Sequence, residues 1–291
     1  MHCPRLDHFV RFNSNGTVSR CGHMVNAPQF DSLEDMENST WLTKTREKMQ
    51  ADQWPAECVR CQETEPGNIR QYAMELDAQT DQSDYLQVGG VLDNVCNAAC
   101  LSCNETLSTR IGSLNGRGFP VYNNLDKFWA LPQHRIVHLD INGGEPSYSK
   151  NYKSLLTNLP PDLRTLRLNT NCSTVLTELA DIAHRGIAVT VTVSCDGIGP
   201  VHELTRWPIT WTTFYNNLMT YKAMPVQLNL WTTVSVLNED DLPNIQAFAK
   251  QHEIDHSWAY LKHPWELSID NKDLEATQAY IRKQKLLRDI V

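Results

Sequence analysis

From residue 85 onward the chain repeats one pattern, in which a short apolar run is followed by a stretch long enough for a helix. The apolar runs lie at residues 86–92, 136–141, 163–168, 187–193, 226–236 and 257–261. Strands that alternate with helices pair in parallel, because each helical crossover returns the chain alongside the previous strand. The pattern therefore predicts an α/β fold in which six βα units form a partial, TIM-like (β/α)6 barrel.

The most distinctive residues follow these apolar runs, where parallel sheets place their binding groups. Three cysteines, Cys96, Cys100 and Cys103, come directly after the first run. A Gly-Gly-Glu-Pro motif at residues 143–146 follows the second run. The carboxyl ends of neighbouring strands meet at one edge of a sheet, so we expect these two motifs to lie close together.

The spacing of the three cysteines is compatible with two kinds of metal centre. Three thiolates at intervals of four and three residues can surround one face of a small metal centre. A structural zinc ion needs a fourth ligand close by. An iron–sulfur cube is normally held by four cysteines, so a cube held by three keeps one iron open to another ligand.

The two glycines of the second motif allow the backbone to approach a ligand closely, because no Cβ stands in the way. The exposed carbonyl groups of this turn and the Glu145 carboxylate suit an ammonium group. The same four residues, Gly143, Gly144, Glu145 and Pro146, also form plain β-turns. Their place at the end of the strand that follows a cysteine cluster favours ligand binding over a plain turn.

Taken together, CxxxCxxC after the first strand and Gly-Gly-Glu-Pro after the second resemble the radical S-adenosylmethionine (SAM) superfamily. The resemblance implies that Cys96, Cys100 and Cys103 hold a [4Fe–4S] cluster whose open iron binds SAM. It also implies that residues 143–146 hold the amino group of SAM. The implied activity is reductive cleavage of SAM to a 5′-deoxyadenosyl radical, which abstracts a hydrogen atom from a substrate.

The third strand extends the resemblance. Thr170 and Asn171 match the Thr-Asn-Gly of the family, although Cys172 stands in place of the glycine. One position departs from the family pattern, because Ser102 occupies a site before the last cluster cysteine that is commonly aromatic. The ligands of the cluster are unaffected by that difference. Cys172 and Cys195 lie outside both cysteine groups, and we expect both to be small buried residues.

The fourth strand ends in a motif that resembles the Ser-x-Asp-Gly of the family. By that match Ser194 and Asp196 meet the ribose or the methionine part of SAM. Arg206 follows downstream and would pair with the SAM carboxylate. A planar guanidinium suits that task, because it donates two parallel hydrogen bonds to a carboxylate.

Residues 1–80 differ in character from residues 81–291, and we predict that the two segments are separate domains. The first segment has four cysteines, Cys3, Cys21, Cys58 and Cys61, with Cys21 next to a short predicted hairpin. Four such thiols can hold one zinc ion or one iron–sulfur cluster. The arrangement resembles the SPASM and twitch modules that accompany many radical SAM enzymes, although here the module precedes the barrel. The resemblance implies a small cysteine-rich α+β domain with a second, auxiliary Fe–S cluster; a zinc ribbon or free thiols are the alternatives.

Composition narrows the class of protein further. The net charge of −8 argues against a general nucleic-acid surface, which depends on neutralising phosphates. No apolar run reaches the 18 residues of a membrane span. Nine cysteines, an odd number, without a signal peptide indicate reduced thiols or metal ligands. These features predict a cytoplasmic protein.

Three functions are compatible with these observations. The first is a radical SAM enzyme that acts on a peptide or protein, a maturase-like role that the SPASM-like segment favours. The second is a radical SAM enzyme that acts on a nucleoside or small metabolite. The third is a non-enzymatic zinc or Fe–S binding module, against which the Gly-Gly-Glu-Pro turn argues. For either enzyme, the resemblance implies a reduced flavodoxin or ferredoxin as electron donor. No acid–base pair in the sequence identifies a further catalytic residue.

Overall fold

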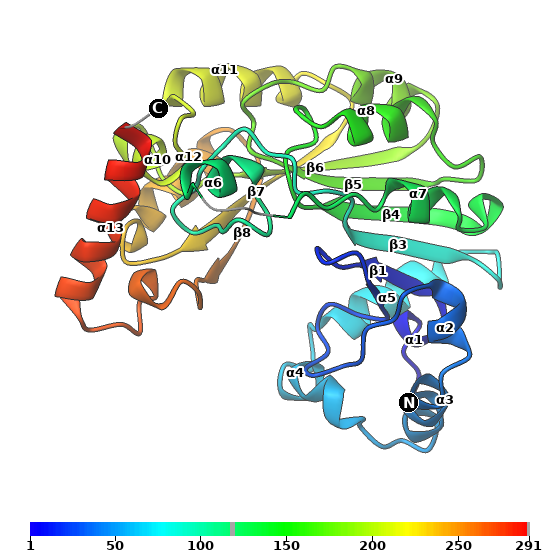
Figure 1. Ribbon diagram of the computed structural model, residues 1–291. Helices are drawn as coiled ribbons and strands as arrows, with labels where there is room; N and C mark the ends of the chain where they lie inside the picture. The colour runs from blue at the N-terminus through cyan, green and yellow to red at the C-terminus, as the bar shows by residue number, and fades with distance from the viewer. Residues whose placement is uncertain (117–119, 290–291) are drawn as a thin grey trace.

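The computed structural model describes residues 1–116 and 120–289. In these ranges eight strands form one sheet in the order β2-β1-β3-β4-β5-β6-β7-β8 (Figure 1). All neighbouring strands are parallel except β1 and β2, which pair antiparallel. The strands are β1 (Phe9–Phe12), β2 (Val18–Ser19), β3 (Leu86–Val91), β4 (Ile136–Asn142), β5 (Thr165–Thr170), β6 (Ala188–Ser194), β7 (Gln227–Val234) and β8 (Asp255–Tyr260).

The six strands expected from residue 85 onward are present as β3 to β8, in chain order and parallel. The predicted α/β fold is confirmed, and the mostly parallel sheet is consistent with a partial, TIM-like barrel. The third of these strands, β5, begins and ends two residues later than expected. Its end is set by the neighbouring strand, because Thr170 pairs with Val193 of β6 and so remains in the sheet.

Helices connect the strands and surround the sheet. They are α1 (Arg5–His8), α2 (Leu33–Glu37), α3 (Thr40–Gln50), α4 (Val59–Glu63), α5 (Ile69–Ala78), α6 (Thr109–Leu114), α7 (Leu125–Trp129), α8 (Lys150–Thr157), α9 (Glu178–His184), α10 (Pro200–Thr205), α11 (Trp211–Lys222), α12 (Leu242–Gln251) and α13 (Leu274–Asp289). Short 3-10 turns are η1 (Ala56–Cys58), η2 (Gln133–Arg135), η3 (Glu239–Asp241) and η4 (Trp265–Leu267). The side chains of Ser32 and Ser39 cap α2 and α3 by accepting backbone hydrogen bonds.

The glycines at positions 112, 116 and 118 suggest a flexible connection after the cysteines, or a plain surface loop. For Gly112 that expectation is wrong, because it lies buried inside α6. The helix forms there because the Ser108 hydroxyl accepts a hydrogen bond from the amide of Ile111 and caps its first turn. Gly116 follows the helix with a φ of +62°, and Gly118 lies outside the described residues.

The sheet has one apolar and one polar face, because alternate residues of a strand point to opposite sides. On the apolar face Leu139, Val191 and Leu230 are fully buried in the main core. Helices α8, α9 and α11 cover that face (Figure 1). The opposite face carries, along β4 to β7, Asp140, Asn142, Arg167, Asn169, Thr190, Thr192 and Asn229. This opposite face of the sheet is therefore mostly polar, although Trp231 of β7 also lies on it.

The N-terminal segment is attached to the sheet and to its core. Strand β1 pairs with β3, with Phe9 opposite Gln87. Helices α2 to α5 form a lobe beside that edge (Figure 1), and Met36, Leu42 and Met49 belong to the same core as the strands. A separate, twitch-like domain over residues 1–80 stays a prediction.

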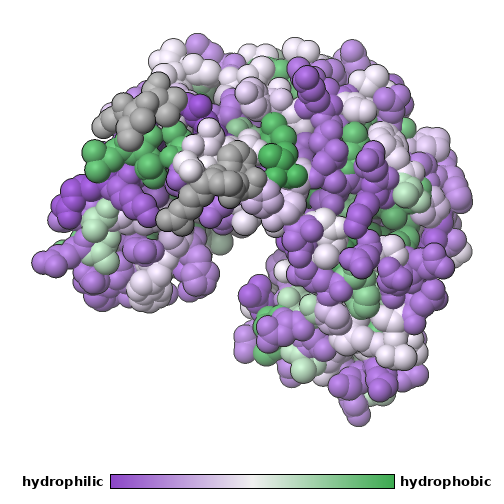
Figure 2. All heavy atoms as spheres, in the orientation of Figure 1, coloured by the Kyte–Doolittle hydropathy of each residue, from purple (hydrophilic) through white to green (hydrophobic). Residues whose placement is uncertain are grey.

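The N-terminal lobe and the other end of the molecule face each other across open space. Figure 2 shows a wide notch between the lobe and the region formed by β8 and α13, with hydrophilic residues predominating on both sides. The polar face of the sheet borders this notch, because the helices cover its other face. None of the helices in the described ranges has the length and apolarity needed to cross a membrane.

Candidate active site

The loop between β3 and α6 carries Cys96, Cys100 and Cys103, and hydrogen bonds fix its start and its middle. At its start, the Asp93 carboxylate accepts a hydrogen bond from the Val95 amide at 3.1 Å and one from Asn151 Nδ2 at 2.8 Å. Farther along, the amide of Leu101 donates to the carbonyl oxygen of Thr205 at 2.9 Å. The cysteines are thus held between the start of α8 and the end of α10.

The three thiols and the diglycine turn line one pocket of about 240 Å³ at the carboxyl ends of the strands. Its other walls come from the ends of β5, β6 and β7 and from the segment after α10. The lining residues are Cys96, Cys100, Ser102, Cys103, Leu107, Gly143, Gly144, Asn169, Thr170, Asn171, Ser194, Arg206 and Thr233. The motifs that the sequence placed after separate strands therefore meet around one cavity.

The diglycine turn is packed directly against the cysteine loop. Gly143 has a φ of +86°, and a Cβ there would lie 2.5 Å from Cγ1 of Val91. Gly144 has a φ of +60°, and a Cβ there would lie 2.7 Å from the carbonyl oxygen of Val95. Any larger residue would force the turn and the loop apart.

The Glu145 carboxylate is fully buried behind the pocket. Its Oε1 accepts hydrogen bonds from Ser147 Oγ and Thr170 Oγ1, both at 2.7 Å, and its Oε2 accepts one from the Asn171 amide at 2.6 Å. Burial raises the pKa of Glu145, and these hydrogen bonds oppose the shift. The carboxylate ties the turn to the end of β5, while Glu145 and Pro146 do not line the pocket in the described residues. Contact between Glu145 and the SAM ammonium stays a prediction.

Arg206 joins the cysteine loop to the end of β6. Its Nη2 donates to Asp196 Oδ2 at 2.9 Å, and its Nη1 lies 3.6 Å from the Cys100 sulfur. Burial alone would lower the pKa of Arg206, but Asp196 and the nearby thiols raise it. The Nε atom is buried without a hydrogen-bond partner among the described residues. Arg206 and Ser194 line the pocket, whereas Asp196 lies behind them and also accepts from the Thr233 amide at 2.8 Å.

Some site residues were not anticipated from the sequence. Asn97, inside the cysteine run, accepts a hydrogen bond from Asn171 Nδ2 at 2.9 Å and donates one to Ser173 Oγ at 2.9 Å. Its position between Cys96 and Cys100 was the only available signal. Cys172 and Cys195 are buried in the core, as expected. Cys172 also has a φ of +62°, the conformation that favours the glycine found there in the resembling family.

The three thiols of the pocket are candidate ligands for a metal centre. Burial raises the pKa of all three, that of Cys103 to about 12, so the thiols carry their protons near neutral pH until a bound metal displaces them. In the described ranges no three His, Cys, Asp or Glu side chains are close enough to share one metal ion. Three thiols line this one cavity, and an Fe–S cluster is normally held by four cysteines, so a cluster here would have one iron without a cysteine ligand.

The four cysteines of the N-terminal lobe also line one cavity, a narrow one, together with Arg5 and Arg70. Burial raises the pKa of the Cys3 thiol to about 11 and that of Cys58 to about 12. Arg5 Nη1 lies 3.8 Å from the Cys21 sulfur. All nine cysteines of the chain are free thiols. The structure therefore brings Cys3, Cys21, Cys58 and Cys61 together, while their role as metal ligands stays a prediction.

Comparison with known proteins gives a structural likeness only. No protein-family model matches the chain, and no curated protein matches it. A crystal structure of Streptococcus suis SuiB bound to precursor peptide SuiA is 13% identical, covers 98% of this chain and 70% of SuiB, and has a TM-score of 0.50. The structure of SuiB bound to S-adenosylmethionine is 12% identical, covers 96% of this chain and 68% of SuiB, and has a TM-score of 0.44. The structure of SuiB alone is 13% identical, covers 97% of this chain and 69% of SuiB, and has a TM-score of 0.43. At 13% identity, the likeness to peptide-bound SuiB shows a shared fold.

Proposed function

We propose that this protein is a radical SAM enzyme. The observation that carries the proposal is the single pocket in which three thiols face a diglycine turn and a buried arginine. The likeness in fold to SuiB supports it. When bound, a [4Fe–4S] cluster supplies one electron to SAM, which splits into methionine and a 5′-deoxyadenosyl radical that abstracts hydrogen from the substrate.

The residues of the pocket have distinct tasks in this proposal. Cys96, Cys100 and Cys103 hold the cluster as thiolates. Carbonyl groups of the turn at Gly143 and Gly144 would accept hydrogen bonds from the SAM ammonium, and the Gly143 carbonyl already accepts one from the Tyr152 hydroxyl at 3.1 Å. Arg206, whose Nε has no partner in the described structure, binds the SAM carboxylate.

Residues of β5 and β6 complete this site. Thr170 and Asn171 hold the turn through Glu145 and line the pocket wall. Ser194 offers its hydroxyl to the ribose or the methionine part of SAM. Asp196 orients the Arg206 guanidinium, because it accepts a hydrogen bond from it.

We further propose an auxiliary Fe–S cluster in the N-terminal lobe, with Cys3, Cys21, Cys58 and Cys61 as ligands. Their common cavity supports this assignment, since four cysteines are the usual ligand set of an Fe–S cluster. Arg5 connects this cavity to the sheet. Its guanidinium lies 4.2 Å from the centre of the Phe9 ring, and Phe9 belongs to β1.

The polar face of the sheet supports a peptide or protein substrate. Burial raises the pKa of Asp140, and the neighbouring Arg167 opposes the shift. Thr192 Oγ1 is buried there without a hydrogen-bond partner in the described part of the chain. A peptide supplies both donors and acceptors to such a face, and the notch gives an extended chain room to enter (Figure 2). SuiB, which shares the fold, was crystallised with the precursor peptide SuiA.

Anaerobic reconstitution tests these proposals. We expect about eight irons per chain, two [4Fe–4S] clusters, and release of 5′-deoxyadenosine from SAM when dithionite is added. The triple variant Cys96→Ala/Cys100→Ala/Cys103→Ala should lose about half of the iron and all SAM cleavage. The matched control, Cys58→Ala/Cys61→Ala, should lose the other half and retain SAM cleavage without substrate.

Two results would contradict the enzyme proposal. Purified protein that contains zinc alone and does not cleave SAM would indicate a binding module. Loss of all the iron in either variant would indicate a single shared centre. Transfer of labelled hydrogen into 5′-deoxyadenosine would then separate peptide substrates from nucleosides and small metabolites.

A further inference from the structure

A second pocket, on the outside of the cysteine loop, has a volume of about 400 Å³. One wall is a single face of α13, formed by Tyr280, Lys283, Gln284 and Leu287. The cysteine loop and α6 form the opposite wall. In the described part of the chain Cys103 lines this outer pocket and the candidate active site, whereas Cys96 and Cys100 line only the latter.

Hydrogen bonds fix α13 against the cysteine loop. The Tyr280 hydroxyl donates to the carbonyl oxygen of Leu101 at 3.0 Å. Arg288 Nη2 donates to the carbonyl oxygen of Ala99 at 2.7 Å. The helix therefore holds its exposed side chains at a fixed position beside Cys103.

The C-terminal half of α13 is basic in a chain that is acidic overall. Residues 282–289 of α13 carry four basic side chains, Arg282, Lys283, Lys285 and Arg288, and one acidic one, Asp289, while the net charge of the whole chain is −8. Arg282, Lys283 and Lys285 are exposed. Glu105 is the acidic residue on the opposite wall of the outer pocket among the described residues. A local positive surface on a negative protein attracts an acidic partner and orients it.

We infer that the basic half of α13 and the cysteine loop beside it form the docking surface for a small acidic electron-carrier protein, such as reduced flavodoxin. This inference rests on the proposed function. In the transfer, the carrier is oxidised by one electron and the cluster held by Cys96, Cys100 and Cys103 is reduced by one. The outer pocket is the suitable side for the carrier to dock, because Cys103 borders this pocket. Docking there leaves the polar face of the sheet available to the substrate.

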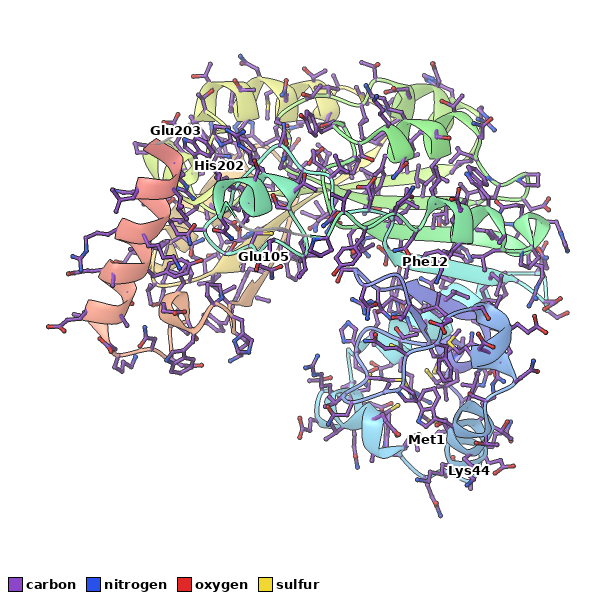
Figure 3. All side chains as sticks on the ribbon, in the orientation of Figure 1. Met1, Phe12, Lys44, Glu105, His202 and Glu203 are labelled. Carbon is purple, nitrogen blue, oxygen red and sulfur yellow. The ribbon has the colours of Figure 1, made fainter. Side chains whose placement is uncertain are left out.

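Charge reversal tests the surface. The variant Arg282→Glu/Lys283→Glu changes two exposed residues outside the candidate active site. The control, Lys44→Glu/Lys48→Glu, makes the same change on two exposed residues of α3 in the N-terminal lobe, far from α13 (Figure 3). Both reconstituted variants and the parent protein are compared for binding of a negatively charged bacterial flavodoxin and for 5′-deoxyadenosine formation with flavodoxin or with dithionite.

We expect the α13 variant to bind flavodoxin about tenfold more weakly at low salt and to lose about the same factor in flavodoxin-driven SAM cleavage. Its dithionite-driven rate should equal that of the parent, and the α3 control should match the parent in every assay. Flavodoxin binding that is unchanged in the α13 variant, or equally weakened in the control, would overturn the docking surface. A parent protein that fails to cleave SAM with dithionite would instead overturn the proposed function.

Discussion

The amide of Glu145 donates a hydrogen bond to the carbonyl oxygen of Val95 at 2.8 Å and thereby joins the diglycine turn of β4 to the loop that carries the three cysteines. Val95 lies one residue before the first of these cysteines, and Glu145 follows Gly144. The turn therefore helps to fix the start of the cysteine loop, next to Cys96. The geometry of the cysteine loop after β3 thus depends on the backbone at the end of β4.

Replacing Gly144 with alanine should separate the turn from the loop. The new Cβ would lie 2.7 Å from the Val95 carbonyl oxygen, in a residue with a φ of +60°. We expect a loss of stability of about 1–3 kcal/mol from backbone strain, and about a hundredfold loss of SAM cleavage from displaced ligands. Urea unfolding and 5′-deoxyadenosine formation measure the two effects.

Gly186→Ala is the matched control for backbone strain. Gly186 has a φ of +88°, but a Cβ at this position would meet no atom within 4 Å beyond its chain neighbours. Its substitution should cost about 1 kcal/mol of stability and leave SAM cleavage unchanged. If both variants lost activity to the same extent, strain alone would account for the effect and the contact with Val95 would not matter.

Much of this architecture was predictable from local sequence patterns. The six parallel strands follow from apolar runs of strand length separated by helix-length segments, and the polar motifs at their carboxyl ends follow from the direction of those strands. The start of α2 follows from Ser32, a residue type that commonly caps helices. These features depend on residues that are neighbours in the chain.

Contacts between distant residues were not predictable. The parallel pairing of β1 with β3, which adds the hairpin to the sheet, leaves no local signal. Arg288 bonds to Ala99 across 189 positions of the chain, and Asn171 bonds to Asn97 across 74. Such pairs form because the fold brings them together, so the spacing of motifs cannot indicate them.

Asp93→Asn should weaken the start of the cysteine loop. The carboxylate accepts hydrogen bonds from the Val95 amide, Asn151 Nδ2 and the Ser149 hydroxyl. The side-chain NH2 group of an asparagine can only donate, so at least one of these three groups would lose its acceptor. We expect a loss of about 1–3 kcal/mol in the free energy of unfolding, since a buried polar group is left without a partner. Asp181→Asn, on the exposed side of α9, should change stability by less than about 0.5 kcal/mol. Equal effects of the two substitutions would contradict this role of Asp93.

Arg206→Lys should lower the affinity for SAM by about tenfold, because an ammonium cannot keep its contact with Asp196 and also bind a carboxylate through two parallel bonds. Titration calorimetry of the reconstituted protein measures the change. Arg20→Lys is the control, since Arg20 is also fully buried and donates to the Phe9 carbonyl oxygen in the N-terminal segment. It should lose stability without losing SAM affinity. SAM affinity that is unaffected by Arg206→Lys would remove Arg206 from the binding site.

His202 should make the protein sensitive to mild acid. Its ring is fully buried on α10, at the same end of the sheet as Glu105 of the cysteine loop (Figure 3), and neither ring nitrogen has a hydrogen-bond partner among the described residues. Burial, aided by the charge of Arg206, lowers the pKa of His202 to about 3. The unfolded chain, with an ordinary histidine pKa of about 6.5, binds the proton more readily, so stability falls as the pH falls from about 6.5 toward 3.

His202→Leu should remove this sensitivity. Between pH 7.5 and 5 the parent protein should lose about 2 kcal/mol more of its free energy of unfolding than the variant, because only the parent has this group to protonate on unfolding. His184→Leu, at an exposed position of α9, should follow the parent. Denaturant unfolding at the two pH values measures the difference. If His202→Leu and the parent lose equal stability, the acid sensitivity belongs to other groups, and the imidazole is protonated in the folded protein as easily as in the unfolded chain.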